Sequence, residues 1–163
     1  MRQHAVVVIR FANDDDLDVL GGIEDDADRL FVERFQPDEW GSATSGRTRA
    51  EQLGFLLVAS EGDEVVGFAH VVEEDGAHLE QVAVRRDAGR RGHGSALVRA
   101  SLLEAGARGH ATVTLHTYAD VPWNAPFYSA LGFVETGPAP DPLLERWGRR
   151  VRMTASTAVP GPR

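Results

Sequence analysis

Three short apolar stretches follow one another between residues 54 and 84, and turn residues separate each from the next. The stretches are 54–59, 65–72 and 78–84, and the turns between them are Glu61-Gly62-Asp63-Glu64 and Asp75-Gly76. Short β-branched and aromatic runs bounded by Gly and Asp are typical of strands joined by hairpins. This part of the chain therefore predicts a meander of three strands.

Further strands and helices are expected on both sides of this meander. The expected strands are 6–9, 112–117, a sixth that begins at 133–135, and an edge strand at 149–153. The expected helices begin after the carboxylates at 14–16, where apolar residues recur at helical spacing, and lie at 95–105 and 123–131. Residues 37–49 are expected to form a loop or a short irregular helix. The order predicts a mixed α/β sheet of about six to seven strands flanked by helices, in one domain at 1–154 with a disordered tail at 155–163.

The composition excludes several classes of function. The 163 residues carry a net charge of −8, whereas a protein that binds nucleic acid needs a basic surface for the phosphates. No apolar run approaches the length of a membrane span, and the apolar stretch near the N-terminus is too short for a secretory signal, so we expect a cytoplasmic protein. The absence of cysteine excludes disulfides and thiol catalysis, and six histidines show no metal-ligand spacing.

A glycine-rich segment, Gly89-Arg90-Arg91-Gly92-His93-Gly94-Ser95, lies between the fourth expected strand and the helix after it. Such a turn directs successive backbone N–H groups at one point in front of a helix N-terminus, which suits a pyrophosphate. The segment lacks the Gly-Lys-Ser/Thr ending of a Walker loop, and Leu97 stands where a dinucleotide fingerprint needs a third glycine. An ordinary flexible turn is the alternative.

A second motif follows about 30 residues later, where Asn124, Pro126, Phe127 and Tyr128 precede Gly132-Phe133. Asn124 is a good helix N-cap, and proline is tolerated in a first helical turn. With both motifs in this order, the chain resembles the GNAT acetyltransferases over residues 6–153. Their pattern pairs an Arg/Gln-x-x-Gly-x-Gly/Ala loop after the fourth strand with an Asn…Phe-Tyr…Gly-Phe helix after the fifth. Gly89 occupies the first position of that loop, where the family usually has Arg or Gln, and Arg90 follows it.

The resemblance implies a GNAT fold whose sheet is splayed by a bulge between the fourth and fifth strands, with acetyl-CoA as the acyl donor. Carried over residue by residue, it places the pantetheine arm on Val82, Ala83 and Val84. It places the pyrophosphate on Arg90, Arg91, Gly92, His93, Gly94 and Ser95, and the thioester beside Asn124, Phe127 and Tyr128. Plain core packing is the alternative for Phe127. The partners that the resemblance implies are acetyl-CoA and an amine acceptor. The negative net charge of the chain would suit a cationic acceptor. Whether the protein forms a homodimer is left open.

Attack of an amine on a thioester needs a polarised carbonyl, a protonated leaving sulfur and an acceptor for the amine proton. In the resemblance the N–H of Val82 polarises the carbonyl and Tyr128 protonates the sulfur, although Tyr128 could also be a packed aromatic. Alternation along the fourth strand predicts one face with Leu79, Gln81 and Ala83 and another with Glu80, Val82 and Val84. Glu80 is therefore the first candidate for the base, with His116 and His70 as alternatives; a solvated strand carboxylate is the other interpretation of Glu80.

We expect residues 24–40 to recognise the acceptor, because the coenzyme uses the other side of the molecule. The candidate carboxylates and aromatics for a cationic amine are Asp25, Asp26, Asp28, Phe31, Phe35 and Trp40. A solvated acidic helix face is the alternative for this segment. Two other functions stay open: a catalytically silent acyl-CoA-binding or regulatory module, and an interaction protein whose loop binds nothing.

Overall fold

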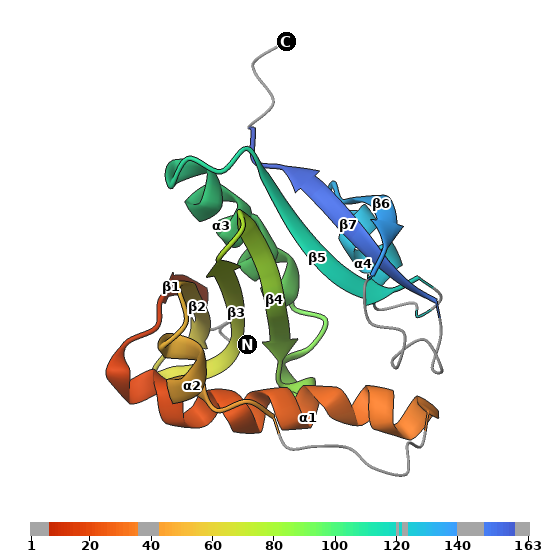
Figure 1. Cartoon of the computed structure of the whole chain (residues 1–163). Coiled ribbons are helices and arrows are strands. Elements are labelled where there is room, and N and C mark those ends of the chain that lie inside the picture. Colours follow the sequence, from red (N-terminus) through yellow and green to blue (C-terminus); the bar gives the residue numbers. More distant parts are fainter. Residues whose placement is uncertain (1–6, 36–42, 120, 122–123, 140–148, 159–163) are drawn as a thin grey trace.

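The computed structural model describes residues 7–35, 43–119, 121, 124–139 and 149–158 (Figure 1). The strands are β1 Val7–Phe11, β2 Gly54–Glu61, β3 Glu64–Glu73, β4 Ala77–Val84, β5 Thr112–Tyr118, β6 Val134–Pro138 and β7 Arg150–Ser156. The α-helices are α1 Leu17–Phe35, α2 Gly46–Ala50, α3 His93–Ala107 and α4 Ala125–Ser129, and the 3-10 helices are η1 Asp14–Asp16 and η2 Arg86–Ala88. The seven strands form one sheet in the order β1-β2-β3-β4-β5-β7-β6, antiparallel throughout except between β4 and β5. The expected mixed α/β sheet is confirmed.

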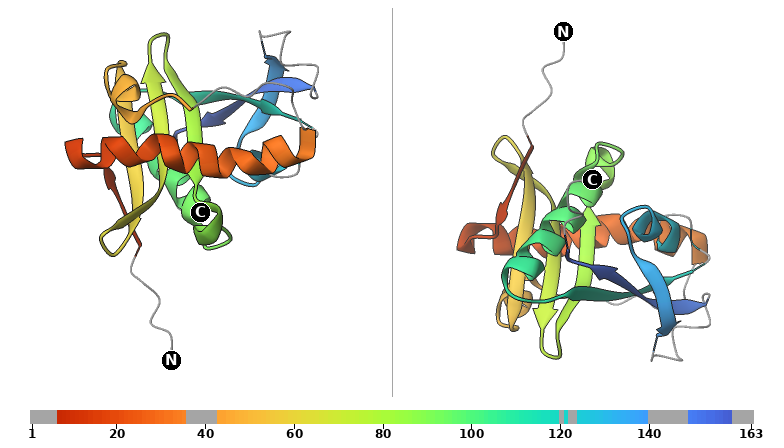
Figure 2. Two further views of the ribbon diagram at one scale, coloured as in Figure 1. Left: turned by 90° about the horizontal axis from the view of Figure 1, so that it is seen from below. Right: turned by 90° about the horizontal axis from the view of Figure 1, so that it is seen from above.

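The two long helices cover opposite faces of the first half of the sheet (Figures 1 and 2). The core cluster on the α1 side consists of Leu20, Ile23, Leu56, Val58, Phe68 and Ala83. The larger cluster on the α3 side includes Phe55, Leu57, Ala59, Leu97, Val98 and Ala105. Successive residues of β2 alternate between the two clusters, as side chains of a strand buried on both faces do.

The carboxylates before α1 fix its start as expected. The side chain of Asn13 accepts a hydrogen bond from the backbone N–H of Asp16, and the Asp16 carboxylate accepts one from the N–H of Asn13 at 2.7 Å. This is a capping box, which satisfies N–H groups that have no partner within the helix. Arg10 on β1 also pairs with Asp16 at 2.6 Å, so the helix start is tied to the edge strand. Among the helices described, none is long and apolar enough to cross a bilayer.

The C-terminal strand is not an edge strand, and that prediction is wrong. β7 pairs with β5 on one side and with β6 on the other, so β1 and β6 are the edges of the sheet. β7 also continues to Ser156, with Ala155 buried, beyond the domain end expected at 154. Local sequence identifies a strand but not its neighbours, because pairing is decided by contacts between distant residues.

Two other elements differ in extent from the predictions. In the segment expected to be a loop or a short irregular helix, 37–49, α2 forms a single helical turn that reaches Ala50, and the Ser45 side chain caps it by accepting from the N–H of Thr48. α4 is confined to Ala125–Ser129, shorter than the expected helix at 123–131, of which residue 123 lies outside the described residues.

Candidate active site

β4 and β5 separate after two paired positions. Ala77 pairs with Val113 and His78 with Thr114, and the described residues contain no further pair between these strands. Figure 1 shows the two ribbons diverging from there towards the end of the sheet near α1. Because β3 pairs with the other edge of β4 as far as Val84, residues 79–84 have an open edge on the β5 side. The splayed opening implied by the resemblance is therefore present.

A β-bulge lies where the strands separate. Val71 pairs with Leu79, but the neighbouring His70 pairs with Gln81, so Glu80 is an extra residue on β4. The resemblance implied a bulge in this region, and the register locates it at Glu80.

The bulge changes which side chains share a face of β4. Leu79, Val82 and Val84 all pack on the α3 side, whereas Ala83 packs on the α1 side. An extra residue shifts the alternation of all residues after it. The prediction that Leu79 shares a face with Ala83, and Glu80 with Val82, is wrong for this reason.

The backbone groups of Val82 and Val84 face the opening. The N–H of Arg85 donates to the carbonyl of Val66 on β3 at 2.8 Å, and the direction of backbone N–H groups alternates along a strand. The N–H of Ala83 therefore also faces β3, while the N–H and C=O groups of Val82 and Val84 face away from it. An extended ligand in the opening would meet these groups as a neighbouring strand does.

The chain turns from η2 into α3 through two residues in the left-handed conformation. Arg90 has a φ of 62°, and Gly92, the N-cap of α3, has a φ of 81°. No described side chain caps the start of α3, and the N–H of Ala96 bonds back to the carbonyl of Gly92. The N–H groups before Ala96 thus have no partner within the helix, which is the arrangement that binds anions.

The glycine pattern can also be matched in a register two residues later, although only the first register places one of its glycines at Gly92, where the φ of 81° favours glycine. Arg91-Gly92-His93-Gly94-Ser95-Ala96 also matches Arg/Gln-x-x-Gly-x-Gly/Ala, and it has an arginine at the first position. In this register Gly94 occupies the first glycine position of the pattern, and it lies in the first turn of α3. The sequence contained this alternative, but the choice between adjacent glycines depends on where the helix begins.

One carboxylate, Glu61 at the end of β2, holds two side chains of the loop. Nη1 of Arg91 lies 2.9 Å from both carboxylate oxygens, and Nε2 of His93 lies 2.6 Å from Oε1. Arg91 and then His93 hold the pKa of Glu61 below its usual value. The His93 side chain is 1% exposed, so it points into the protein. Sequence reasoning did not identify Glu61, because no local pattern marks a contact 30 residues away.

α4 places Phe127 against the start of α3. A Cβ added to Gly94 would lie 3.4 Å from Cζ of Phe127 and 3.9 Å from a methyl carbon of Val84. The N-terminus of α3, the end of β4 and α4 therefore meet at one place. Asn124 precedes α4, but its side chain does not cap the helix as predicted; Oδ1 accepts a hydrogen bond from Thr117 of β5 at 2.9 Å.

Tyr128 of α4 lies in a small group of aromatic side chains with Phe127 and Phe133. Its ring centroid is 5.0 Å from that of Phe127 and 5.7 Å from that of Phe133. Burial raises the pKa of Tyr128 to about 12, since a phenolate would be poorly solvated there. The hydroxyl therefore keeps its proton at neutral pH.

Glu80 lies beside two histidines where β4 and β5 separate. Nε2 of His78 is 3.7 Å from Oε2 of Glu80, and the ring centroids of His78 and His116 are 4.7 Å apart. Nδ1 of His78 is hydrogen-bonded to the hydroxyl of Thr114 at 2.8 Å, across the last paired position. Burial lowers the pKa of both histidines, which favours their neutral, proton-accepting form. The Glu80 side chain is 50% exposed.

His70 is buried in a network with Arg49 of α2 and Glu24 of α1. Nη1 of Arg49 donates to Nδ1 of His70 at 2.9 Å, and Nη2 donates to Oε1 of Glu24 at 2.6 Å. All three residues are buried, His70 to 1% exposure. Burial and the charge of Arg49 lower the pKa of His70 to about 4. A catalytic base must reach the substrate, so His70 does not qualify.

The acidic residues of α1 expected to bind the acceptor have partners within the protein. Asp25 accepts from the backbone N–H of Ala43 at 3.1 Å, and Asp26 accepts from that of Arg86 at 2.7 Å. Trp40 and the side chains of Phe31 and Phe35 lie outside the described part of the chain. Asp25 and Asp26 thus hold α1 against neighbouring segments.

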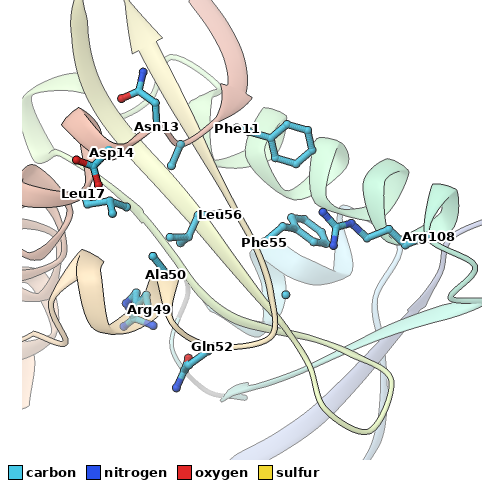
Figure 3. A pocket seen from close by; sticks show the side chains of 12 residues that line it. Phe11, Asn13, Asp14, Leu17, Arg49, Ala50, Gln52, Phe55, Leu56 and Arg108 are labelled. Carbon is cyan, nitrogen blue, oxygen red and sulfur yellow. The ribbon is translucent and has the colours of Figure 1, made fainter.

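A cavity of about 340 Å³ opens beside β1, α2 and β2 (Figure 3). Phe11, Leu17 and Phe55 contribute apolar side chains to its lining, and Arg108 contributes a charged one. β3 separates this cavity from β4, and neither the glycine loop nor α4 lines it. It is distinct from the opening between β4 and β5.

The family model of the acetyltransferase (GNAT) family matches residues 22–133. The match includes the glycine loop, the splayed strands and α4. The chain therefore belongs to the GNAT family of acetyltransferases.

Solved structures share the fold over nearly the whole chain. The ribosomal-protein-S18-alanine N-acetyltransferase from Escherichia coli is 24% identical, with a TM-score of 0.70 over 96% of this chain and 97% of that one. The PaiA N-acetyltransferase from Thermoplasma acidophilum, solved with coenzyme A, is 14% identical, with a TM-score of 0.72 over 93% and 99%. An aminoglycoside 6′-N-acetyltransferase, also solved with coenzyme A, is 19% identical, with a TM-score of 0.69 over 96% and 99%.

Proposed function

We propose that the protein transfers an acetyl group from acetyl-CoA to a primary amine of a small molecule or a peptide. Membership of the GNAT acetyltransferases supports the reaction, and the two similar structures solved with coenzyme A support the donor. Similar structures are named for the alanine of a ribosomal protein and for an aminoglycoside. One fold can serve many substrates, so the acceptor must be found by experiment. The net charge of −8 favours a cationic one.

The meeting of α3, α4 and the open edge of β4 is the observation that carries this proposal. Gly94 brings Phe127 and Val84 to the same place, beside the N–H groups that begin α3. In the proposed complex the pantetheine arm extends along β4 from Val82 to Val84 and the pyrophosphate meets the loop at 90–95. The thioester then lies on the side of Tyr128.

The proposed reaction forms a bond between the amine nitrogen and the acetyl carbonyl carbon and breaks the carbon–sulfur bond. The N–H of Val82 donates to the carbonyl oxygen, where negative charge develops. Glu80, or a water that it orders, accepts the proton that the nitrogen loses. Tyr128 donates a proton to the departing sulfur. The products are an amide and the free thiol of the coenzyme.

Two measurements test the function as a whole. Acetyl-CoA should raise the unfolding temperature, because a ligand that binds only the native state stabilises it. Release of free thiol should then be followed with a panel of amines that ranges from small cations to peptides with a free N-terminus. Stabilisation without thiol release from any amine would indicate a silent acyl-CoA-binding module, and the proposed reaction would be wrong.

Gly94→Val should weaken acetyl-CoA binding about tenfold or more, which corresponds to roughly 1.4 kcal/mol or more. Even a Cβ at this position would touch the ring of Phe127 at 3.4 Å, so the two further methyl groups must displace that ring or enter the space beside the loop. Calorimetry gives the affinity. Gly22→Val is the matched control, because a Cβ at Gly22 would have no atom within 4 Å apart from its chain neighbours and the nearby backbone of its own helix. An unchanged affinity in folded Gly94→Val would contradict the assignment.

Glu80→Gln should lower kcat/KM for the amine by about 10²-fold or more, while the affinity for acetyl-CoA stays nearly unchanged. The acidic limb of the pH–rate profile should move or vanish, because a base must be deprotonated to accept a proton. Glu74→Gln, an exposed carboxylate in the β3–β4 turn, is the control. A profile of wild-type height and shape would remove Glu80 from the mechanism and leave His116 or water as the base.

A further inference from the structure

At each end of α3, three side chains of the same types, a glutamate, an arginine and a histidine, tie the helix to the sheet. At the N-terminal end, Glu61 of β2 binds Arg91 and His93. At the C-terminal end, Glu73 of β3 binds Arg108 at 2.7 Å and His110 at 2.6 Å. The two carboxylate side chains are similarly exposed, 17% for Glu61 and 20% for Glu73. Each trio has a glycine with a positive φ between its arginine and its histidine, Gly92 at 81° and Gly109 at 95°, so the trios differ in the end of α3 that they hold.

At the N-terminal end, the residue between them is Gly92, in the centre of the glycine loop. Arg91 and His93 are the neighbours of Gly92 on either side, and Gly92 and Arg90 both have left-handed backbones. An arginine is strained in this conformation, and such strain persists only where surrounding contacts hold it. The carboxylate of Glu61 binds the side chains of the residues on both sides of Gly92. It therefore restrains the backbone that presents the N–H groups at the start of α3.

We infer that Glu61 is a positioning residue of the coenzyme site: it fixes Arg91 and His93 so that the N–H groups at the start of α3 stay directed at the pyrophosphate. The inference rests on the proposed function. Glu61 itself does not touch the coenzyme. It acts by preorganisation, which raises affinity because the loop then loses less freedom on binding.

The charge of Glu61 has the opposite effect, since a carboxylate near the loop repels a pyrophosphate. If repulsion were the stronger effect, removing the charge would tighten binding. If positioning is the stronger effect, removing the carboxylate weakens binding. The two effects therefore predict changes of opposite sign in the dissociation constant for acetyl-CoA.

The experiment compares Glu61→Gln with Glu73→Gln, which breaks the equivalent trio at the other end of α3. Both variants should lose some resistance to urea. Glu61→Gln should raise Kd and KM for acetyl-CoA about tenfold, with kcat at saturating donor retained, whereas Glu73→Gln should leave Kd unchanged. Glu61→Asp keeps the charge but shortens the side chain, so it should also weaken acetyl-CoA binding. It also provides the test if Glu61→Gln does not fold.

A donor without a pyrophosphate sharpens the comparison. With acetylpantetheine, Glu61→Gln should have the same kcat/KM as the wild type, because only the loop is affected. Equal Kd values for Glu61→Gln and Glu73→Gln, tighter binding by Glu61→Gln, or an equal loss with acetylpantetheine would each overturn the inference while wild-type binding of acetyl-CoA stays intact. A wild-type protein that binds no acetyl-CoA would instead overturn the proposed function, and this inference with it.

Discussion

Replacing Tyr128 by phenylalanine should lower kcat by about 10²- to 10⁴-fold and leave the affinity for acetyl-CoA nearly unchanged. The variant keeps the ring, and with it the contacts to Phe127 and Phe133. What it loses is a hydroxyl whose pKa is raised to about 12. Such a group stays protonated at neutral pH and, as a weak acid, acts only when negative charge develops on the sulfur. The loss should therefore appear in turnover rather than in binding.

Steady-state kinetics beside a direct binding measurement checks this expectation. Tyr118→Phe is the matched control, because it removes the hydroxyl of the other tyrosine in the chain, and it should turn over nearly as the wild type does. If Tyr128→Phe also keeps wild-type turnover, Tyr128 is a packing residue, and the sulfur receives its proton from water or another group.

Replacing Arg49 by methionine should reduce the free energy of unfolding by about 3–5 kcal/mol. Arg49 is the cation between Glu24 and His70, and all three side chains are buried. Burial already raises the pKa of Glu24, and Arg49 opposes that shift by its charge and its hydrogen bond. Without Arg49 the protein must bury an unpaired carboxylate or protonate it, and both are costly.

Urea unfolding measures the effect, and two further variants identify its cause. Arg47→Met on the same helix removes an exposed arginine that pairs with Asp14 and Asp18, and little change is expected because exposed pairs contribute little. Adding Glu24→Leu to Arg49→Met should restore much of the lost stability, because no unpaired charge then remains buried. Equal unfolding midpoints for Arg49→Met and Arg47→Met would show that the buried pair contributes nothing to stability.

The parts of the fold that could be predicted are those whose signals are local. The turns of the β2–β3–β4 meander contain Gly62 and Gly76, and both have the positive φ that such turns need, 59° and 92°. The carboxylates at 14–16 mark the start of α1 because they act on N–H groups within one turn. The two motifs of the candidate site could be located for the same reason, since each is short and contiguous.

The bulge at Glu80 could not be predicted from its own strand. One extra residue leaves no mark in the sequence from Leu79 to Val84, and simple alternation then assigns the wrong faces. The partners of the site residues were equally hidden. Glu61 binds Arg91 of the loop, which is 30 residues away in the sequence. Thr117 donates a hydrogen bond to the Asn124 side chain, which local rules assign to helix capping. These contacts exist only once the sheet has formed.

The position of β7 has a consequence for how the protein emerges from a ribosome. β5 has seven paired positions with β7 but only two with β4, and β6 pairs only with β7 within the described strands. The sheet from β1 to β4 can pack with α1 and α3 once residue 107 has left the ribosome. β5 and β6 must wait, with unpaired edges, until residues 150–156 are made and insert between them. The β5 side of the opening is therefore built late in translation, after most of the glycine loop is already in place.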